Sequence, residues 1–241
     1  MKNTGNFQLE TRLKKLRDFW GSKLTPAENE TMERHIEFLR ESGALDKVLK
    51  KGDLAPEFNL KNQNGQIISS SELLKNGPLV ISFYRGSWCP YCVEEVKALD
   101  LFYPQIQENG ADLVVLSPQS FTRTEKQAEE LHLKYNLLVD EDNKTGKAFG
   151  LVYEFPQYLK NLYTERFNNN IQEINEGFCL GTSYSGSICN RTRREYLGRF
   201  GRSGLPFPPR TAGHNSIYQK FSETIRACLK FSYKDFLTLR S

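Results

Sequence analysis

The sequence lacks the features of a membrane protein and of a small disulfide-bonded scaffold. No stretch approaches the roughly 20 apolar residues that a spanning helix needs, and the best run, Leu79–Tyr84, is far shorter. The N-terminal stretch MKNTGNFQLETRLKKL has neither an apolar core nor a small-residue cleavage site, so we expect no secretory signal. Only five cysteines occur in 241 residues, and they are spread along the chain. We therefore expect a cytoplasmic, reducing location and no membrane partner.

Histidine is also scarce, and neither sign of charge dominates. Lysine and arginine number 33 against 29 aspartate and glutamate, and a net charge of +4 does not by itself indicate a nucleic-acid partner. The three histidines are scattered, and Cys179 and Cys189 do not form a second closely spaced pair. The sequence therefore predicts no metal site and no organic cofactor.

Residues 1–50 have the pattern of a helical arm. Apolar residues recur at three- and four-residue steps from Leu9 to Trp20 among charged ones. Thr25 followed by Pro26 is typical of a helix start, and Glu28 completes a capping-box pattern. We expect this arm to serve in packing or in a homodimer, without chemistry of its own.

The middle of the chain alternates between strand and helix patterns. The five expected elements are a buried strand at Leu79–Tyr84, a helix at Cys92–Gln107, a second buried strand at Asp112–Ser117, a helix at Thr122–Tyr135 and a short strand at Leu137–Asp140. This alternation predicts an α/β fold with a parallel sheet and helices on its faces. A hairpin with its turn at Asn62–Gly65 is expected before this region, and a helix over Lys147–Phe155 after it.

Two cysteines with two residues between them carry the chemical signal. Cys89-Pro90-Tyr91-Cys92 follows the first buried strand and opens a helix. A helix N-terminus stabilises a thiolate, and this spacing lets one sulfur attack while the other resolves the mixed intermediate. Half of a zinc site and a pair of inert core thiols are the weaker alternatives.

Two segments resemble a known family. Lys51–Phe58 (KGDLAPEF) resembles the G-D-x-A-P-x-F segment of peroxiredoxins, and Leu79–Cys92 is similar to the active-site segment of the thioredoxin-fold superfamily. Together they are similar to the peroxiredoxin-like branch of the alkyl hydroperoxide reductase/thiol-specific antioxidant (redoxin) group. The resemblance covers roughly Lys51–Glu176. It implies a thioredoxin-like peroxiredoxin domain over residues 51–177, with the helical arm as an N-terminal extension.

The resemblance also implies roles for the site residues. On the family pattern P-x-x-x-T-x-x-C, Cys92 falls on the peroxidatic cysteine, Cys89 replaces the threonine and Arg85 replaces the proline. The implied activity is a thiol-dependent peroxidase in which Cys92 attacks a hydroperoxide, Cys89 resolves, and thioredoxin or a similar dithiol reduces the pair. From the residues themselves, Arg85 is expected either to hold an anionic leaving group or lower a thiol pKa through its fixed charge, or to be a solvated loop residue. Trp88 is expected to cover the thiols, and Pro90 to start the helix.

Three other functions stay open at this point. A thioredoxin-like protein disulfide oxidoreductase would use Cys89 as the nucleophile and Cys92 as the resolver. A non-enzymatic redox-sensing protein, or an inactive truncated family member, would lack a reactive thiol at neutral pH. A nucleic-acid binder resting on the basic stretch Arg191–Arg202 ranks last.

Residues 178–241 form an atypical basic segment without strand or helix periodicity. It is crowded with Gly, Ser, Arg and Pro, which predicts disorder. A reading-frame shift is the other interpretation: in a shifted frame Ser183–Asn190 can encode P-I-P-A-x-F-V-I and Gly204–His214 can encode D-Y-R-F-R-P-E-P-Q-D-I, strings that the resemblance leads us to expect there. Under this interpretation Ser185 stands in the place of a cis-proline, and the sheet lacks its last strands.

Overall fold

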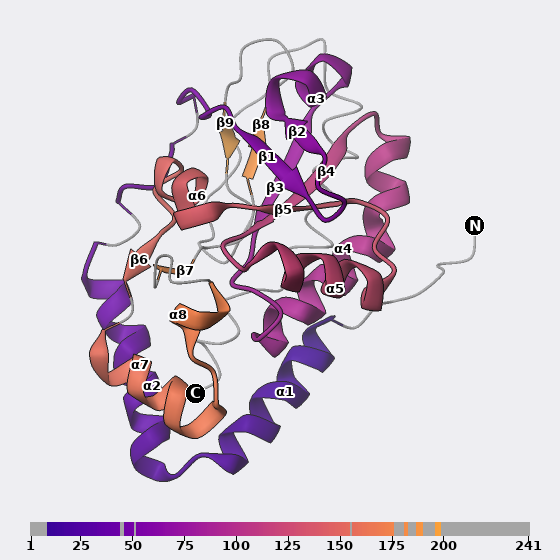
Figure 1. The fold of residues 1–241 in the computed structure, drawn as a ribbon. Coiled ribbons are helices and arrows are strands. Elements are labelled where there is room, and N and C mark those ends of the chain that lie inside the picture. Colours follow the sequence, from indigo (N-terminus) through magenta and orange to yellow (C-terminus); the bar gives the residue numbers. More distant parts are fainter. Residues whose placement is uncertain are drawn as a thin grey trace.

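A seven-stranded mixed sheet forms the centre of the computed structural model, which describes residues 9–43, 46–50, 52–154, 156–175, 181–182, 187–189 and 196–198 (Figure 1). The strands of this sheet are β1 (Asn59–Asn62), β2 (Ile67–Ser69), β3 (Leu79–Phe83), β4 (Asp112–Ser117), β5 (Asn136–Val139), β8 (Ser187–Cys189) and β9 (Tyr196–Gly198). Their order is β2-β1-β5-β4-β3-β8-β9. The short strands β6 (Tyr153–Glu154) and β7 (Gly181–Thr182) pair separately.

The helices cover both faces of the sheet and extend beyond it. In chain order they are α1 (Leu9–Lys23), α2 (Pro26–Glu41), α3 (Ser70–Asn76), α4 (Pro90–Glu108), α5 (Phe121–Leu131), the 3-10 turn η1 (Glu141–Asn143), α6 (Lys144–Ala148), α7 (Gln157–Phe167) and α8 (Ile171–Ile174). Strands β3, β4 and β5 run parallel, and α4 and α5 connect them. The predicted strand–helix alternation is therefore confirmed, and with it the mixed α/β architecture.

The central strands are apolar because both of their faces are buried. Every residue of β3 is buried, and successive side chains point to opposite faces of the sheet. Val80 belongs to the core beneath α4, whereas Leu79, Ile81 and Phe83 belong to the core on the other face, with Phe149. Full burial of one such side chain contributes about 1.5–3 kcal/mol, so this short strand anchors both layers. The predicted hairpin is also present, since β1 pairs antiparallel with β2.

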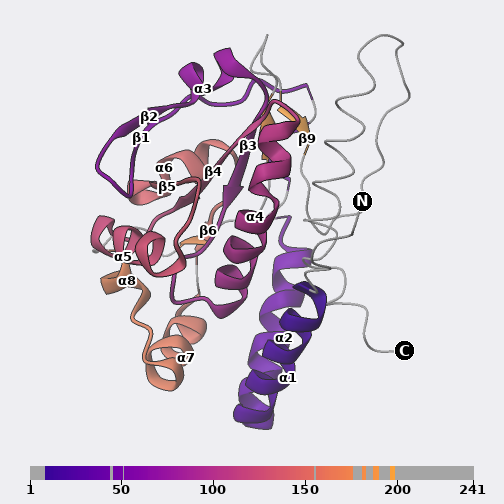
Figure 2. The same ribbon diagram turned by 90° about the vertical axis from the view of Figure 1, so that its right-hand side faces the viewer.

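The arm formed by α1 and α2 lies against the helical layer. Helix α1 runs beside α4, where Arg12 pairs with Glu94 at 2.8 Å (Figure 2). Helix α2 contacts α7. The predicted capping box at the start of α2 is confirmed. The Glu28 amide donates to Thr25 Oγ1 at 3.3 Å, and the Thr25 amide donates to Glu28 Oε2 at 2.7 Å.

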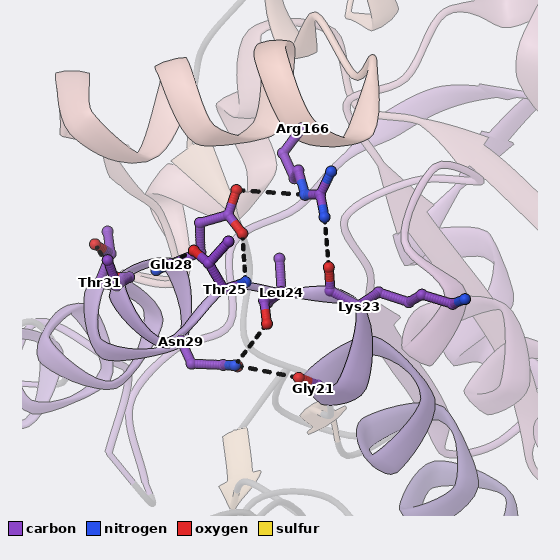
Figure 3. A network of polar contacts seen from close by, with 9 residues as sticks. Gly21, Lys23, Leu24, Thr25, Glu28, Asn29, Thr31 and Arg166 are labelled. Atoms are coloured by element: carbon purple, nitrogen blue, oxygen red, sulfur yellow. Dashed lines mark hydrogen bonds and ion pairs between the residues drawn. The ribbon is translucent and has the colours of Figure 1, made fainter.

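Arg166 of α7 joins that helix to the connection between α1 and α2. Its Nε lies 3.3 Å from Glu28 Oε1, and its Nη2 donates to the carbonyl oxygen of Lys23 (Figure 3). The Glu28 carboxylate therefore caps α2 and also pairs with Arg166 of α7. This contact fixes α7 against the arm on the side of the molecule where the cysteine pair lies.

The helix predicted over Lys147–Phe155 is wrong. Helix α6 ends at Ala148, and the chain turns at Gly150 before entering β6. Gly150 has φ +70°, and a Cβ at this position would overlap the carbonyl oxygen of Lys47. Only glycine fits such a turn, so the backbone leaves the helix here despite the apolar residues around it.

The sheet continues past β3, contrary to the expectation that its last strands are missing. Strand β8 pairs antiparallel with β3, with Leu79 opposite Cys189, and β9 pairs with β8. The edge of β3 is therefore covered over these residues. Ser185, Cys179 and Cys228, and the two segments examined for a frame shift apart from β8, lie outside the described residues.

Candidate active site

The cysteine pair lies where β3 passes into α4. The end of a parallel strand and the start of the following helix are a common place for reactive groups in α/β sheets. The connecting loop turns at Gly86, which has φ +136°. A Cβ there would come within 2.8 Å of the Trp88 ring and 3.3 Å of Gln119 Oε1, so the loop requires glycine.

Cys89 is the N-cap of α4, and its sulfur takes the place of a capping oxygen. The amide of Cys92 donates to Cys89 Sγ at 3.3 Å, and the thiol of Cys92 donates to the same sulfur, with the two sulfurs 2.6 Å apart. Pro90 lies in the first turn, where a missing N–H costs little. The Cys89 and Cys92 side chains are buried, with 1% and 7% of their surfaces exposed. A disulfide between them requires little movement.

Arg85 brings a positive charge onto Cys89. Its Nη2 donates to Cys89 Sγ at 3.0 Å, and its Nη1 lies 3.5 Å from the hydroxyl of Tyr163. The guanidinium carbon lies 5.2 Å from the centre of the Trp88 ring, and the Trp88 indole N–H donates to the Arg85 carbonyl at 3.1 Å. The cation is therefore held between an aromatic face and the sulfur.

These contacts shift the pKa values of the two thiols in opposite directions. Burial by itself raises the pKa of Cys89, but the hydrogen bond from Cys92 and the charge of Arg85 outweigh it and bring the pKa to about 6. Burial, together with the hydrogen bond to Cys89 and the charge of Cys89, raises the pKa of Cys92 well above its ordinary value. At neutral pH this arrangement favours a Cys89 thiolate that accepts a hydrogen bond from a Cys92 thiol.

Helix α7 closes the site on the side of Trp88. Tyr163 meets the Trp88 ring edge to face, with centroids 5.5 Å apart, and it belongs to a small apolar core with Leu159, Ile171 and Ile174. Burial raises the pKa of Tyr163, so its hydroxyl stays protonated. The arm reaches this region through His35 of α2, whose pKa is lowered by burial and then by the charge of Arg85.

A buried polar network supports the loop from below. Gln119, which follows β4, accepts a hydrogen bond from the Ser87 amide at 2.8 Å and donates to the Tyr84 hydroxyl at 2.7 Å. The Tyr84 hydroxyl donates to Gln127 of α5 at 2.6 Å. Tyr84, Gln119 and Gln127 are buried, so the network lies within the core.

All five residues predicted for the site lie together in the structure. They are Arg85, Trp88, Cys89, Pro90 and Cys92. The sequence analysis missed Tyr163 and Gln119. Gln119 lies two residues after the end of the parallel strand β4, a position that could have indicated it, whereas Tyr163 comes from a distant helix without a local signal.

Two further features of the described part of the chain bear on the predictions. None of its helices has the length and apolarity to cross a bilayer. Within the same residues, His, Cys, Asp and Glu side chains form no group of three or more that could hold a metal ion.

Comparison with known proteins gives a consistent family assignment. A sequence model of the AhpC/TSA family matches residues 51–168. Peroxiredoxin Q, chloroplastic, of Sedum lineare is 34% identical over 113 residues, which are 47% of this chain and 60% of that protein. A Helicobacter pylori protein described as peroxiredoxin bcp is 34% identical over 105 residues, covering 42% of this chain and 68% of its own length.

The fold agrees with this assignment. The crystal structure of peroxidoxin BcpB from Mycobacterium tuberculosis has a TM-score of 0.52 and 19% sequence identity, and the match covers 75% of this chain and 96% of that one. The matches thus span 60% of the Sedum protein, 68% of the Helicobacter protein and 96% of the Mycobacterium chain. The sequence matches show that this chain belongs to the AhpC/TSA family of peroxiredoxins, and its thioredoxin-like fold agrees with them.

Proposed function

We propose that the protein is a thiol-dependent peroxidase that reduces hydroperoxides with Cys89 and Cys92. One observation carries the proposal: a buried thiol pair with sulfurs 2.6 Å apart, in which the Arg85 guanidinium donates a hydrogen bond to the sulfur of Cys89. The family of the chain supports the same chemistry. The small volume of a hydroperoxide suits thiols that expose 1% and 7% of their surfaces.

The reaction has three balanced steps. The Cys89 thiolate attacks the terminal oxygen of the hydroperoxide, the O–O bond breaks, and the leaving alkoxide takes a proton, giving an alcohol and Cys89 sulfenic acid. The Cys92 thiol then attacks the sulfenic sulfur, and water leaves as the disulfide forms. Finally an external dithiol, of the thioredoxin type in a reducing cytoplasm, exchanges with the disulfide and is itself oxidised.

This assignment reverses the order of roles that the family pattern implied. The resemblance favoured Cys92 as the attacking residue, because Cys92 falls on the peroxidatic position. The contacts support Cys89 instead, since the guanidinium of Arg85 is 3.0 Å from its sulfur and its pKa is about 6, whereas the pKa of Cys92 is raised. The thiolate is the nucleophile, so the residue with the lowered pKa attacks first at neutral pH.

The same order of roles is the one expected of a thioredoxin-like disulfide oxidoreductase, which is the second candidate function. That activity requires the nucleophilic sulfur to reach a disulfide in another protein. Cys89 is 1% exposed, and this burial favours a small peroxide over a protein disulfide. The two functions differ in whether peroxide is consumed.

The proposal is tested by turnover of hydrogen peroxide and of an organic hydroperoxide with a dithiol as the reductant, next to reduction of insulin disulfides. We expect peroxide consumption that is lost in Cys89→Ser. Cys92→Ser should still react once per molecule and then stop at the sulfenic acid. Reduction of insulin without consumption of peroxide would move the assignment to the disulfide oxidoreductase. Inactivity in both assays, with Cys89 unreactive at neutral pH, would indicate a non-enzymatic family member.

A further inference from the structure

The backbone of the loop that carries Arg85 is hydrogen-bonded to a buried side chain, that of Gln119. Between β3 and α4, the Ser87 amide donates to Gln119 Oε1 at 2.8 Å, and Gln119 is fully buried, with 0% of its surface exposed. Within the loop, the Cys89 amide donates to the Gly86 carbonyl at 3.1 Å. The bond to Gln119 therefore holds the middle of a loop whose two ends are Arg85 and the reactive cysteine.

The orientation of the Gln119 amide is fixed by its neighbours. A backbone N–H can only donate, so the Gln119 oxygen must face Ser87 and the amide nitrogen must face the core. That nitrogen donates to the Tyr84 hydroxyl at 2.7 Å and to Gln127 Oε1 at 2.9 Å. The Gln127 nitrogen is buried without a hydrogen-bond partner in the described part of the chain. The network is thus organised around the loop, at the cost of one unmade hydrogen bond in α5.

The steric fit of the loop agrees with this view. A Cβ on Gly86 would meet the Trp88 ring and Gln119 Oε1, so the backbone passes directly over the amide. Trp88 in turn donates to the Arg85 carbonyl and supports the guanidinium with its ring. A displacement of the loop away from Gln119 would move Arg85 relative to a cysteine that is fixed at the N-terminus of α4.

We propose that Gln119 is a positioning residue, which holds the Tyr84–Trp88 loop so that the Arg85 guanidinium stays against Cys89 Sγ. Gln119 does not touch the sulfur and acts through Arg85. The inference rests on the proposed role of Cys89 as the attacking thiolate. It goes beyond that role because it assigns the control of the thiolate to a buried amide on the neighbouring strand end.

The test is the pH profile of Cys89 alkylation in the full-length reduced protein, read by mass spectrometry on the peptide that carries Cys89. Gln119→Met removes the acceptor and keeps the volume of the side chain. We expect the midpoint of the profile to rise by on the order of one pH unit, because the contact between Arg85 and the sulfur is weakened. Gln127→Met is the matched control: Gln127 accepts a hydrogen bond from the Tyr84 hydroxyl in the same buried network, but it does not take part in the hydrogen bond to the Ser87 amide, so the midpoint should stay within about 0.3 units.

Gln119→Asn keeps a polar amide in the buried site but is too short to reach both Ser87 and Tyr84. It should shift the midpoint in the same direction, and it serves where Gln119→Met loses the native fold. An unchanged midpoint in a folded Gln119 variant, or an equal shift in Gln127→Met, would overturn the positioning role. A native protein whose Cys89 titrates like a free thiol would instead overturn the proposed function, so the two failures are distinguishable.

Discussion

Replacement of Arg85 by methionine tests the electrostatic basis of the site. The guanidinium donates to Cys89 Sγ from 3.0 Å, in a site where the sulfur is 1% exposed. Two unit charges about 4 Å apart attract by about 4 kcal/mol at an effective dielectric constant of about 20. At 1.36 kcal/mol per pKa unit, this attraction corresponds to about 3 units.

In Arg85→Met, the other contacts of Cys89 still act on its pKa. Cys92 still donates its hydrogen bond, which favours the Cys89 thiolate, while burial still disfavours it. We therefore expect Arg85→Met to raise the pKa of Cys89 from about 6 to about 8 or higher. The thiolate fraction at pH 7 then falls from about 90% to less than about 10%.

The midpoint of the alkylation pH profile is the quantity to measure, because a rate at a single pH understates the change. A thiolate of higher pKa is intrinsically more nucleophilic, so part of the lost thiolate fraction is compensated in the rate. Arg12→Met is the charge-matched control, since Arg12 is half exposed and pairs with Glu94 on the outside of α4. A folded Arg85→Met protein with a midpoint within about 0.5 units of the native one would show that Arg85 does not set the pKa of Cys89.

Three further predictions concern stability. The Cys89 pKa is lowered on folding, from about 8.5 in an unfolded chain to about 6. Its contribution is therefore complete above about pH 8.5 and lost as the pH falls through about 6. The free energies of unfolding in urea of the reduced native protein and of Cys89→Ser should differ more and more as the pH rises from about 6 to about 8.5, by up to about 3 kcal/mol. A difference that does not depend on pH would contradict the lowered pKa of Cys89. Thr25→Ala should lower the free energy of unfolding by about 1 kcal/mol through loss of the capping box, while Thr31→Ala, inside the same helix, should cost less; equal losses would argue against the cap. Phe83→Ala should cost about 3–5 kcal/mol because Phe83 is 2% exposed in β3, and Leu101→Ala, 53% exposed on α4, should stay within about 0.5 kcal/mol in the same measurement.

The fold between β3 and β5 could be predicted from the sequence because its signals are local. A strand that is buried on both faces is mostly apolar, as Leu79–Phe83 is apart from Ser82, and the helix between two such strands must be long enough to return to the same edge. Gly150 shows where local patterns fail. The apolar residues around it continue a helical pattern, but contact with the Lys47 carbonyl forces a turn.

Only the site residues within the segment from Arg85 to Cys92 could be predicted from the sequence. Arg85, Trp88 and Cys89 are close in sequence, so their proximity in space follows from the loop. Tyr163 and Gln119 are brought to that loop by the packing of α7 and by the sheet register, which no short motif encodes. The sequence could not predict which of the two thiols attacks first, since this depends on which sulfur the Arg85 guanidinium reaches.

In the proposed reaction, a hydroperoxide converts Cys89 and Cys92 into a disulfide, with Cys89 attacking first. The most direct test is stoichiometric titration of the reduced protein with hydrogen peroxide, followed by intact-mass analysis. We expect the native protein to lose the mass of two hydrogen atoms, Cys92→Ser to gain one oxygen atom, and Cys89→Ser to remain unchanged at neutral pH. Oxidation of Cys92 in Cys89→Ser, together with an inert Cys89 in Cys92→Ser, would contradict the account.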